Sequence, residues 1–213
     1  MTDGLRTEGL STEGLSPDGA STDGPGTAGG TSRGWLDELS RVDQAVYEAI
    51  AATPTPRMDR AMRWVAHAAD YSRLSMAAAT GLALWGGRPG RRAAVGGLAS
   101  VAATSAAVNL MMKPLGRRRR PDREGAEVPA GRQVPMPASR SFPSGHAAAA
   151  TAFATGAARW MPAAGAPLYA LAAIVSYSRV HTGVHFPGDV VAGAVIGLTV
   201  GSLTAGVLAS RWG

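Results

Sequence analysis

The run AAVGGLASVAATSAAVNLMM, residues 93–112, contains no charged side chain, and neither do residues 160–178 or residues 190–210. The hydrocarbon core of a bilayer is about 30 Å thick, and roughly 20 apolar residues in a helix cross it. Each run therefore predicts a transmembrane helix. All three runs are rich in Ala, Gly, Val and Leu, and small side chains allow helices to pack closely in lipid.

Two shorter segments extend this count of transmembrane helices. Residues 71–87 are long enough if Arg73 reaches the interface, and residues 141–158 make a span whose first turn is polar. A sixth helix at residues 58–69 carries three charged side chains and would span poorly alone. We therefore predict an all-α fold, a polytopic membrane bundle of five to six transmembrane helices.

The N-terminal part divides into two regions. Residues 1–33 repeat a five-residue unit rich in Gly, Ser, Thr and acids, which buries too little apolar surface to fold, so we predict a disordered tail. The tail lacks the pattern of a secretory signal peptide. In residues 34–57 apolar side chains recur at helical spacing between charges, which predicts an amphipathic helix in the membrane interface and a linker. Residues 58–213 then form the transmembrane domain.

The composition excludes several classes of partner and site. The 213 residues include 21 Lys and Arg against 15 Asp and Glu, but no basic helix face with interleaved aromatics, so we expect no nucleic-acid partner. The absence of cysteine excludes disulfides and thiolate metal sites.

Three polar islands separate the apolar runs: the first island (Lys113–Pro121), the second island (Pro143–His146) and the third island (Ser178–Asp189). Because successive spans cross the membrane in alternate directions, all three islands are expected on one face. Arginines in the predicted Arg88–Arg92 loop favour a cytoplasmic location for the opposite face, although the basic residues of segment 113–140 favour the reverse. We expect a multi-pass plasma-membrane protein with the islands on the outer face.

Cationic side chains in the first and third islands can hold a phosphoryl group. Lys113, Arg120 and Arg179 would neutralise its equatorial oxygens, the arginines with a planar fork and the lysine as a point charge. For the three arginines at residues 117–119 we favour contact with lipid headgroups.

The second island lies where a helix should begin. Free amides and the positive end of the helix dipole make Ser144 and Gly145 a ready anion site. A purely capping role for Ser144 is the plainer alternative. That alternative does not explain His146, which enters an alanine-rich span and is costly there. We predict that His146 donates a proton to a leaving oxygen.

His185 and Asp189 are four residues apart at the start of the last apolar run. Two interpretations stay open: the carboxylate orients a nucleophilic imidazole, or the pair is an ordinary interfacial hydrogen bond. His181 precedes His185 at the spacing of a metal-binding pair, but the nearby arginines would repel a cation, so we predict no metal and no cofactor. His67 is expected to be structural.

These residues resemble a known signature. Lys113-x6-Arg120-Pro121, the second island, and Ser178-Arg179-x5-His185-x3-Asp189 are similar to the three-part motif of the type 2 phosphatidic acid phosphatase superfamily, the lipid phosphate phosphatases. Vanadium-dependent haloperoxidases share this motif. The resemblance covers residues 59–211 and implies metal-independent hydrolysis, with residues 58–213 as a transmembrane phosphatase domain. By resemblance the nucleophile is His185, the acid His146 and the partner of His185 Asp189. The matched phosphate ligands are Lys113, Arg120, Ser144, Gly145 and Arg179.

We therefore predict an integral membrane phosphatase that hydrolyses lipid-linked phosphate monoesters or diphosphates through a phosphohistidine. Phosphatidic acid, phosphatidylglycerol phosphate and polyprenyl (di)phosphate are the candidate substrates. One alternative is a vanadate-dependent haloperoxidase-like oxidoreductase, although such relatives are typically larger and soluble. Another is a non-catalytic phospholipid-binding membrane protein, which has no need for His146, His185 and Asp189 together. The sequence identifies neither the lipid nor the oligomeric state.

Overall fold

The structure, a computed structural model, describes residues 31–112 and 118–212. These residues form helices and short helical turns without strands, which confirms the all-α prediction for the described part. The predicted tail up to residue 30 and Lys113 lie outside the described residues. The main helices are α1 (Thr31–Ala52), α2 (Pro56–Ala68), α3 (Arg73–Trp85), α4 (Gly87–Ala106), α6 (Gly145–Ala158), α7 (Pro162–His181) and α8 (Pro187–Trp212).

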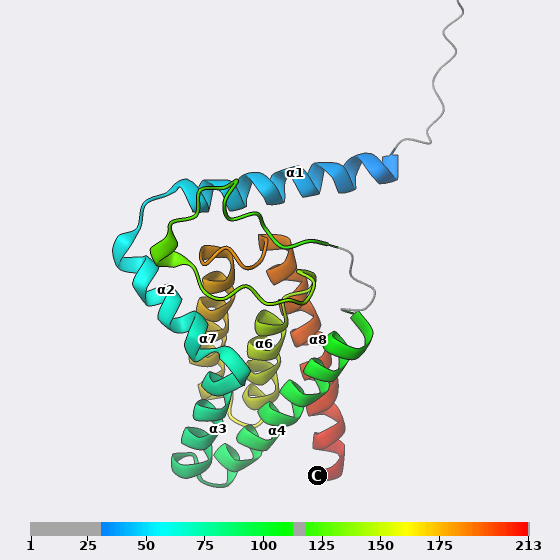
Figure 1. Cartoon of the computed structure of the whole chain (residues 1–213). Coiled ribbons are helices and arrows are strands. Elements are labelled where there is room, and N and C mark those ends of the chain that lie inside the picture. Colours follow the sequence, from blue (N-terminus) through cyan, green and yellow to red (C-terminus); the bar gives the residue numbers. More distant parts are fainter. Residues whose placement is uncertain (1–30, 113–117, 213) are drawn as a thin grey trace, which may run out of the picture.

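Helix α6 is central and packs against α4, α7 and α8 (Figure 1). It begins at Gly145, with Ser144 as its N-cap, and has 14 residues. At 1.5 Å per residue it is about 21 Å long, which is shorter than the roughly 30 Å hydrocarbon core. The prediction that this helix starts at Ser141 is wrong, because Ser141 lies in the irregular segment before the helix.

Glycines on α8 bring it close to α6. Gly193 and Gly197 lie one turn apart, and a Cβ atom added at Gly193 would lie 2.4 Å from the carbonyl oxygen of Ser144. At Gly197 the added Cβ would lie 2.3 Å from the carbonyl oxygen of Ala148. The close packing expected from the small residues is confirmed at this contact.

The connection between α3 and α4 differs from the predicted Arg88–Arg92 loop. Only Gly86 separates the two helices, and Gly87 has a φ of 59°. A Cβ atom at Gly90 would lie 2.1 Å from the carbonyl oxygen of Leu82. Glycines let the chain turn this tightly. Arg88, Arg91 and Arg92 therefore belong to the first turns of α4, and the prediction of a loop at Arg88–Arg92 is wrong.

Two helical segments of the described chain are long and apolar enough to cross a membrane. They are Gly87–Met112, which is α4 extended by a π-helical segment (Ala107–Met112), and Pro187–Trp212. The five to six spans expected from the sequence stay a prediction. The first turn of α8 contains Pro187, as its fixed φ suggests.

Helix α1 lies across one end of the bundle, and the C-terminus lies at the other end (Figure 1). Tyr47 is buried on the bundle and packs edge-on against Phe186, with ring centroids 5.4 Å apart. Trp35, Leu39 and Val42 are exposed. The predicted helix is confirmed, although it begins inside the expected tail, and its position in the membrane interface stays a prediction.

Candidate active site

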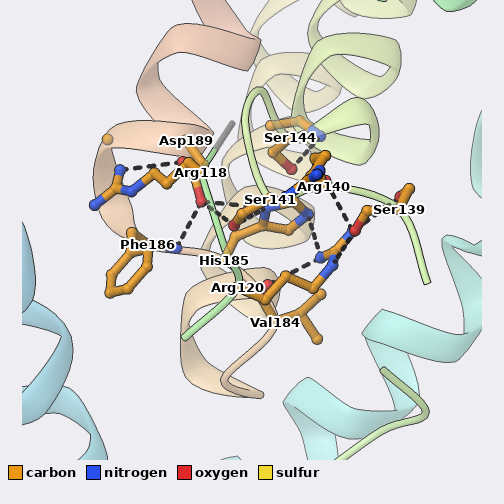
Figure 2. A network of polar contacts seen from close by, with 12 residues as sticks. Arg118, Arg120, Ser139, Arg140, Ser141, Ser144, Val184, His185, Phe186 and Asp189 are labelled. Carbon is orange, nitrogen blue, oxygen red and sulfur yellow. Dashed lines mark hydrogen bonds and ion pairs between the residues drawn. The ribbon is translucent and has the colours of Figure 1, made fainter. Parts of the chain in front are cut away.

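The three polar islands meet at the end of the bundle that α1 covers. The amide of Ser141 donates to the carbonyl of Arg118 at 3.1 Å, and the amide of Ser144 donates to the carbonyl of Asp189 at 2.9 Å. Figure 2 shows the side chains that converge there. The predicted convergence is therefore found for every site residue except Lys113, which the structure does not describe.

His185 is held between a carboxylate and a guanidinium. Its Nδ1 lies 3.5 Å from Asp189 Oδ2, and its Nε2 lies 3.2 Å from Arg120 Nη1 (Figure 2). A guanidinium can only donate, so Nε2 accepts and Nδ1 carries the proton. The lone pair of Nε2 is thus directed away from Asp189, as a nucleophile requires.

Burial shifts the acid–base behaviour of His185, which is 3% exposed in the loop between α7 and α8. Desolvation lowers its pKa; the hydrogen bond with Asp189 opposes this effect, and the charge of Arg120 adds to it. The imidazole is therefore neutral at neutral pH.

Asp189 is buried in the first turn of α8 and accepts several hydrogen bonds. The amide of Phe186 donates to Oδ2 at 3.0 Å, and the hydroxyl of Ser141 donates to the same oxygen. These bonds leave the carboxylate one orientation, with Oδ2 towards His185. Sequence reasoning missed Ser141 because it was assigned to a helical turn.

Arg118 bridges two carboxylates. Its Nη1 lies 3.1 Å from Asp189 Oδ1, and its Nη2 lies 2.5 Å from Oδ2 of Asp43 on α1. Asp43 also accepts a hydrogen bond from the amide of Gly188 at 2.7 Å, and the guanidinium lies 4.1 Å from the ring centroid of Phe186. The prediction that Arg118 contacts lipid headgroups is therefore wrong, since a carboxylate 75 residues earlier in the chain binds it.

The two predicted phosphate-binding arginines differ in their partners. Arg120 donates to the carbonyl oxygens of Ser139 and Val184, both at 2.9 Å. Arg179 is 2% exposed and donates to the carbonyl of Ala66. Among the described residues, the buried Nε of Arg179 has no hydrogen-bond partner. An unsatisfied buried donor is costly, so an anion at this position would stabilise the site.

His146 faces a carboxylate that the sequence did not single out. Its Nε2 lies 3.2 Å from Asp70 Oδ1, and the same oxygen lies 3.5 Å from Arg179 Nη2. Asp70 belongs to the short turn η1 (Asp70–Ser72), where Tyr71 has a φ of 55° and Ser72 a φ of 58°. No periodic pattern marks such a turn in the sequence.

The predicted anion site at the start of α6 is only partly free. Ser144 accepts from the amide of Ala147 at 3.5 Å, which confirms the capping role, and its own amide is bonded to Asp189. Gly145 opens the helix and leaves room for a ligand beside His146.

The two remaining histidines have carboxylate neighbours. His181 Nε2 lies 2.8 Å from Asp59 Oδ1, and His67 Nδ1 lies 3.8 Å from Asp70 Oδ2. His181 thus fills a structural role that links α7 to α2, and His67 borders the site through Asp70.

The model of the PAP2 superfamily matches residues 94–212 of this chain, which is more than half of it. The chain belongs to the PAP2 superfamily. The matched residues include all three islands, so the resemblance noted in the sequence is confirmed.

Curated relatives and solved structures agree with this membership. The chain is 39% identical over 106 residues to decaprenylphosphoryl-5-phosphoribose phosphatase of two Mycobacterium tuberculosis strains, which is 49% of this chain and 56% of the relative. The chain thus spans about half the length of the curated relatives it matches.

Two solved structures share the fold. The crystal structure of a transmembrane PAP2 type phosphatidylglycerolphosphate phosphatase from Bacillus subtilis matches with a TM-score of 0.62 and 24% identity, covering 82% of this chain and 88% of that chain. Aquifex aeolicus LpxE matches with a TM-score of 0.64 and 24% identity, covering 76% of this chain and 94% of that chain.

Proposed function

We propose that this PAP2 protein is a membrane phosphatase that hydrolyses a phosphate ester carried by a lipid. The observation that carries the proposal is the arrangement around His185. Its Nε2 lies beside Arg120, and its Nδ1 lies beside the carboxylate of Asp189. A structural histidine would need neither the oriented lone pair nor the surrounding cations. The phosphatase relatives and the two segments able to cross a membrane support the same conclusion.

In the proposed reaction the lone pair of His185 Nε2 attacks phosphorus. The bond between phosphorus and the ester oxygen breaks, and His146 gives its proton to that oxygen. Water then attacks phosphorus, the bond between phosphorus and Nε2 of His185 breaks, and His146 takes a proton from this water. Phosphate leaves, and His185 returns to its neutral form.

The positive charges stabilise the phosphoryl oxygens during both steps. Arg179, with its unsatisfied buried Nε, and Arg120, beside the nucleophile, are the described members of the cradle. We propose Lys113 as a further member on the basis of its motif position alone. No step in this scheme uses a metal ion, since the side-chain cations neutralise the phosphate.

The substrate class follows from the relatives and from the proposed membrane setting. A polyprenyl-linked phosphate is favoured because the curated relatives are named for a decaprenyl substrate. The end of the bundle that holds Arg211 lies opposite the site, which supports a site on the outer face of the plasma membrane (Figure 1).

The test is phosphate release by the purified protein in mixed micelles. Polyprenylphosphoryl-5-phosphoribose, phosphatidylglycerol phosphate and phosphatidic acid serve as substrates, with His185→Ala as the variant. We expect release by the wild-type protein and a loss of at least about 10³-fold in the variant, because removal of a nucleophile leaves only background catalysis.

Unchanged turnover in His185→Ala would remove the proposed nucleophile. Halide oxidation with vanadate, without phosphate release, would instead favour the oxidoreductase alternative. Retention of the wild-type melting temperature by the variant separates loss of chemistry from loss of folding.

A further inference from the structure

A cavity of about 180 Å³ borders His146 and reaches between η1, α3, α4 and its π-helical extension, and α6. At roughly 30 Å³ per water molecule, this volume equals about six waters. Pockets that enclose drug-sized ligands are larger, about 300–1,000 Å³. The cavity therefore has room for a small headgroup beside His146.

The wall of this cavity includes polar side chains for which the described part of the chain shows no side-chain hydrogen bond. Among the described residues, hydroxyls such as those of Thr80 and Ser100 bond to carbonyls of their own helices. No such bond is found, within the described part of the chain, for the polar side chains of the cavity wall; Ser75 is 7% exposed, whereas Asn109 is exposed to the surroundings. These side chains are Ser72, Ser75, Ser105 and Asn109. Serine hydroxyls and an asparagine amide can both donate to and accept from hydroxyl groups of a ligand in the cavity.

Asn109 lies in the π-helical segment Ala107–Met112, which ends the apolar segment Gly87–Met112. Short π-helical stretches are rare and frequently occur at functional sites, because they redirect side chains. This stretch presents the amide of Asn109 to the same cavity that His146 borders.

The chemistry of the proposed reaction decides which part of the substrate lies there. The acid must reach the ester oxygen that leaves, so the alcohol part of the substrate lies on the His146 side of phosphorus. The cavity occupies that side. Its amide and hydroxyl groups can bond to hydroxyls of the alcohol, and its apolar residues can contact the carbon skeleton.

We propose that this cavity is a subsite for the hydroxylated headgroup of the leaving alcohol, such as a pentose or glycerol unit, and that it selects headgroups with free hydroxyls. The inference rests on the proposed phosphatase function. A pentose and a glycerol headgroup share this chemistry, and their relative rates distinguish them.

The test compares kcat/KM of wild type, Asn109→Leu and Ser105→Ala on three substrates in mixed micelles. Polyprenylphosphoryl-5-phosphoribose and phosphatidylglycerol phosphate have leaving groups with free hydroxyls, whereas phosphatidic acid has none. We expect kcat/KM of each variant to fall about 3- to 10-fold on the hydroxylated substrate that the wild-type protein hydrolyses faster, which is the range for one neutral hydrogen bond. On phosphatidic acid the change should stay below about 2-fold.

Two controls keep the outcome interpretable. Thr199→Ala changes an exposed hydroxyl on α8 that bonds to Val195 of its own helix, and it should leave all three rates unchanged. Inhibition by orthovanadate, which occupies only the phosphate cradle, should be equal in wild type and Asn109→Leu.

Equal losses on all three substrates, or no loss on either hydroxylated substrate, would overturn the subsite. A change in vanadate inhibition of the same size as the loss in kcat/KM would also overturn it, since the effect would then lie in the cradle. If the wild-type protein released phosphate from none of the substrates, the proposed function itself would fail.

Discussion

Replacement of Arg118 by Gln should lower both the stability of the protein and its turnover. Nη2 of Arg118 lies 2.5 Å from Asp43 and Nη1 lies 3.1 Å from Asp189, so the substitution leaves two carboxylates without the cation between them. Breaking a buried ion pair costs about 3–5 kcal/mol. Because the Arg118 side chain is 31% exposed and Asp189 keeps its other donors, we expect about 2–3 kcal/mol here.

Thermal unfolding in detergent and steady-state kinetics measure the two effects. One kcal/mol lowers the melting temperature of a protein of this size by about 2–4 °C, so Arg118→Gln should melt roughly 5–10 °C lower. The turnover number should fall about 10- to 100-fold, as it does when a group that orients a reacting side chain is lost. Addition of Asp43→Asn should recover part of the stability, because one of the two repelling carboxylates is then neutral.

Arg119→Gln is the matched control, since Arg119 is the neighbouring arginine and is exposed. It should change neither the melting temperature nor the turnover. If Arg118→Gln behaved like this control, the contacts from Asp43 through Arg118 to Asp189 would contribute neither to stability nor to turnover, which would refute the predicted role of Arg118.

Two other predictions concern protonation and helix packing. Burial lowers the pKa of His185 below its ordinary 6.5, so the loss of kcat/KM that comes from protonation of this nucleophile should lie below pH 6.5; an acid limb of the profile centred at or above pH 6.5 would contradict this assignment. Gly193→Ala would place a Cβ atom 2.4 Å from the Ser144 carbonyl oxygen, so α8 must shift away from α6, and melting temperature and turnover should both fall. Gly206→Ala is its control, since a Cβ there meets nothing within 4 Å; equal effects of the two substitutions would exclude the packing explanation.

Several features of the site were predictable because they are local. His185 and Asp189 are four residues apart at the start of a helix, so their contact follows from helical geometry. The capping role of Ser144, which was the plainer alternative to an anion site, is likewise a local contact before an alanine-rich run. Predictions failed where the chain is irregular, as at Ser141, or where one glycine replaces a loop, as at Gly86.

The sequence alone predicted that this chain is helical, that its islands carry candidate phosphate-binding and proton-transfer groups, and that His185 and Asp189 interact. These properties depend on residue type, apolar run length and short spacing, which a single sequence displays. Only the tertiary structure decided that Asp43 binds Arg118, that Asp70 lies beside His146, and that a cavity with polar side chains borders His146. Such contacts join residues that are distant along the chain, and helix packing, not local periodicity, determines which of them meet.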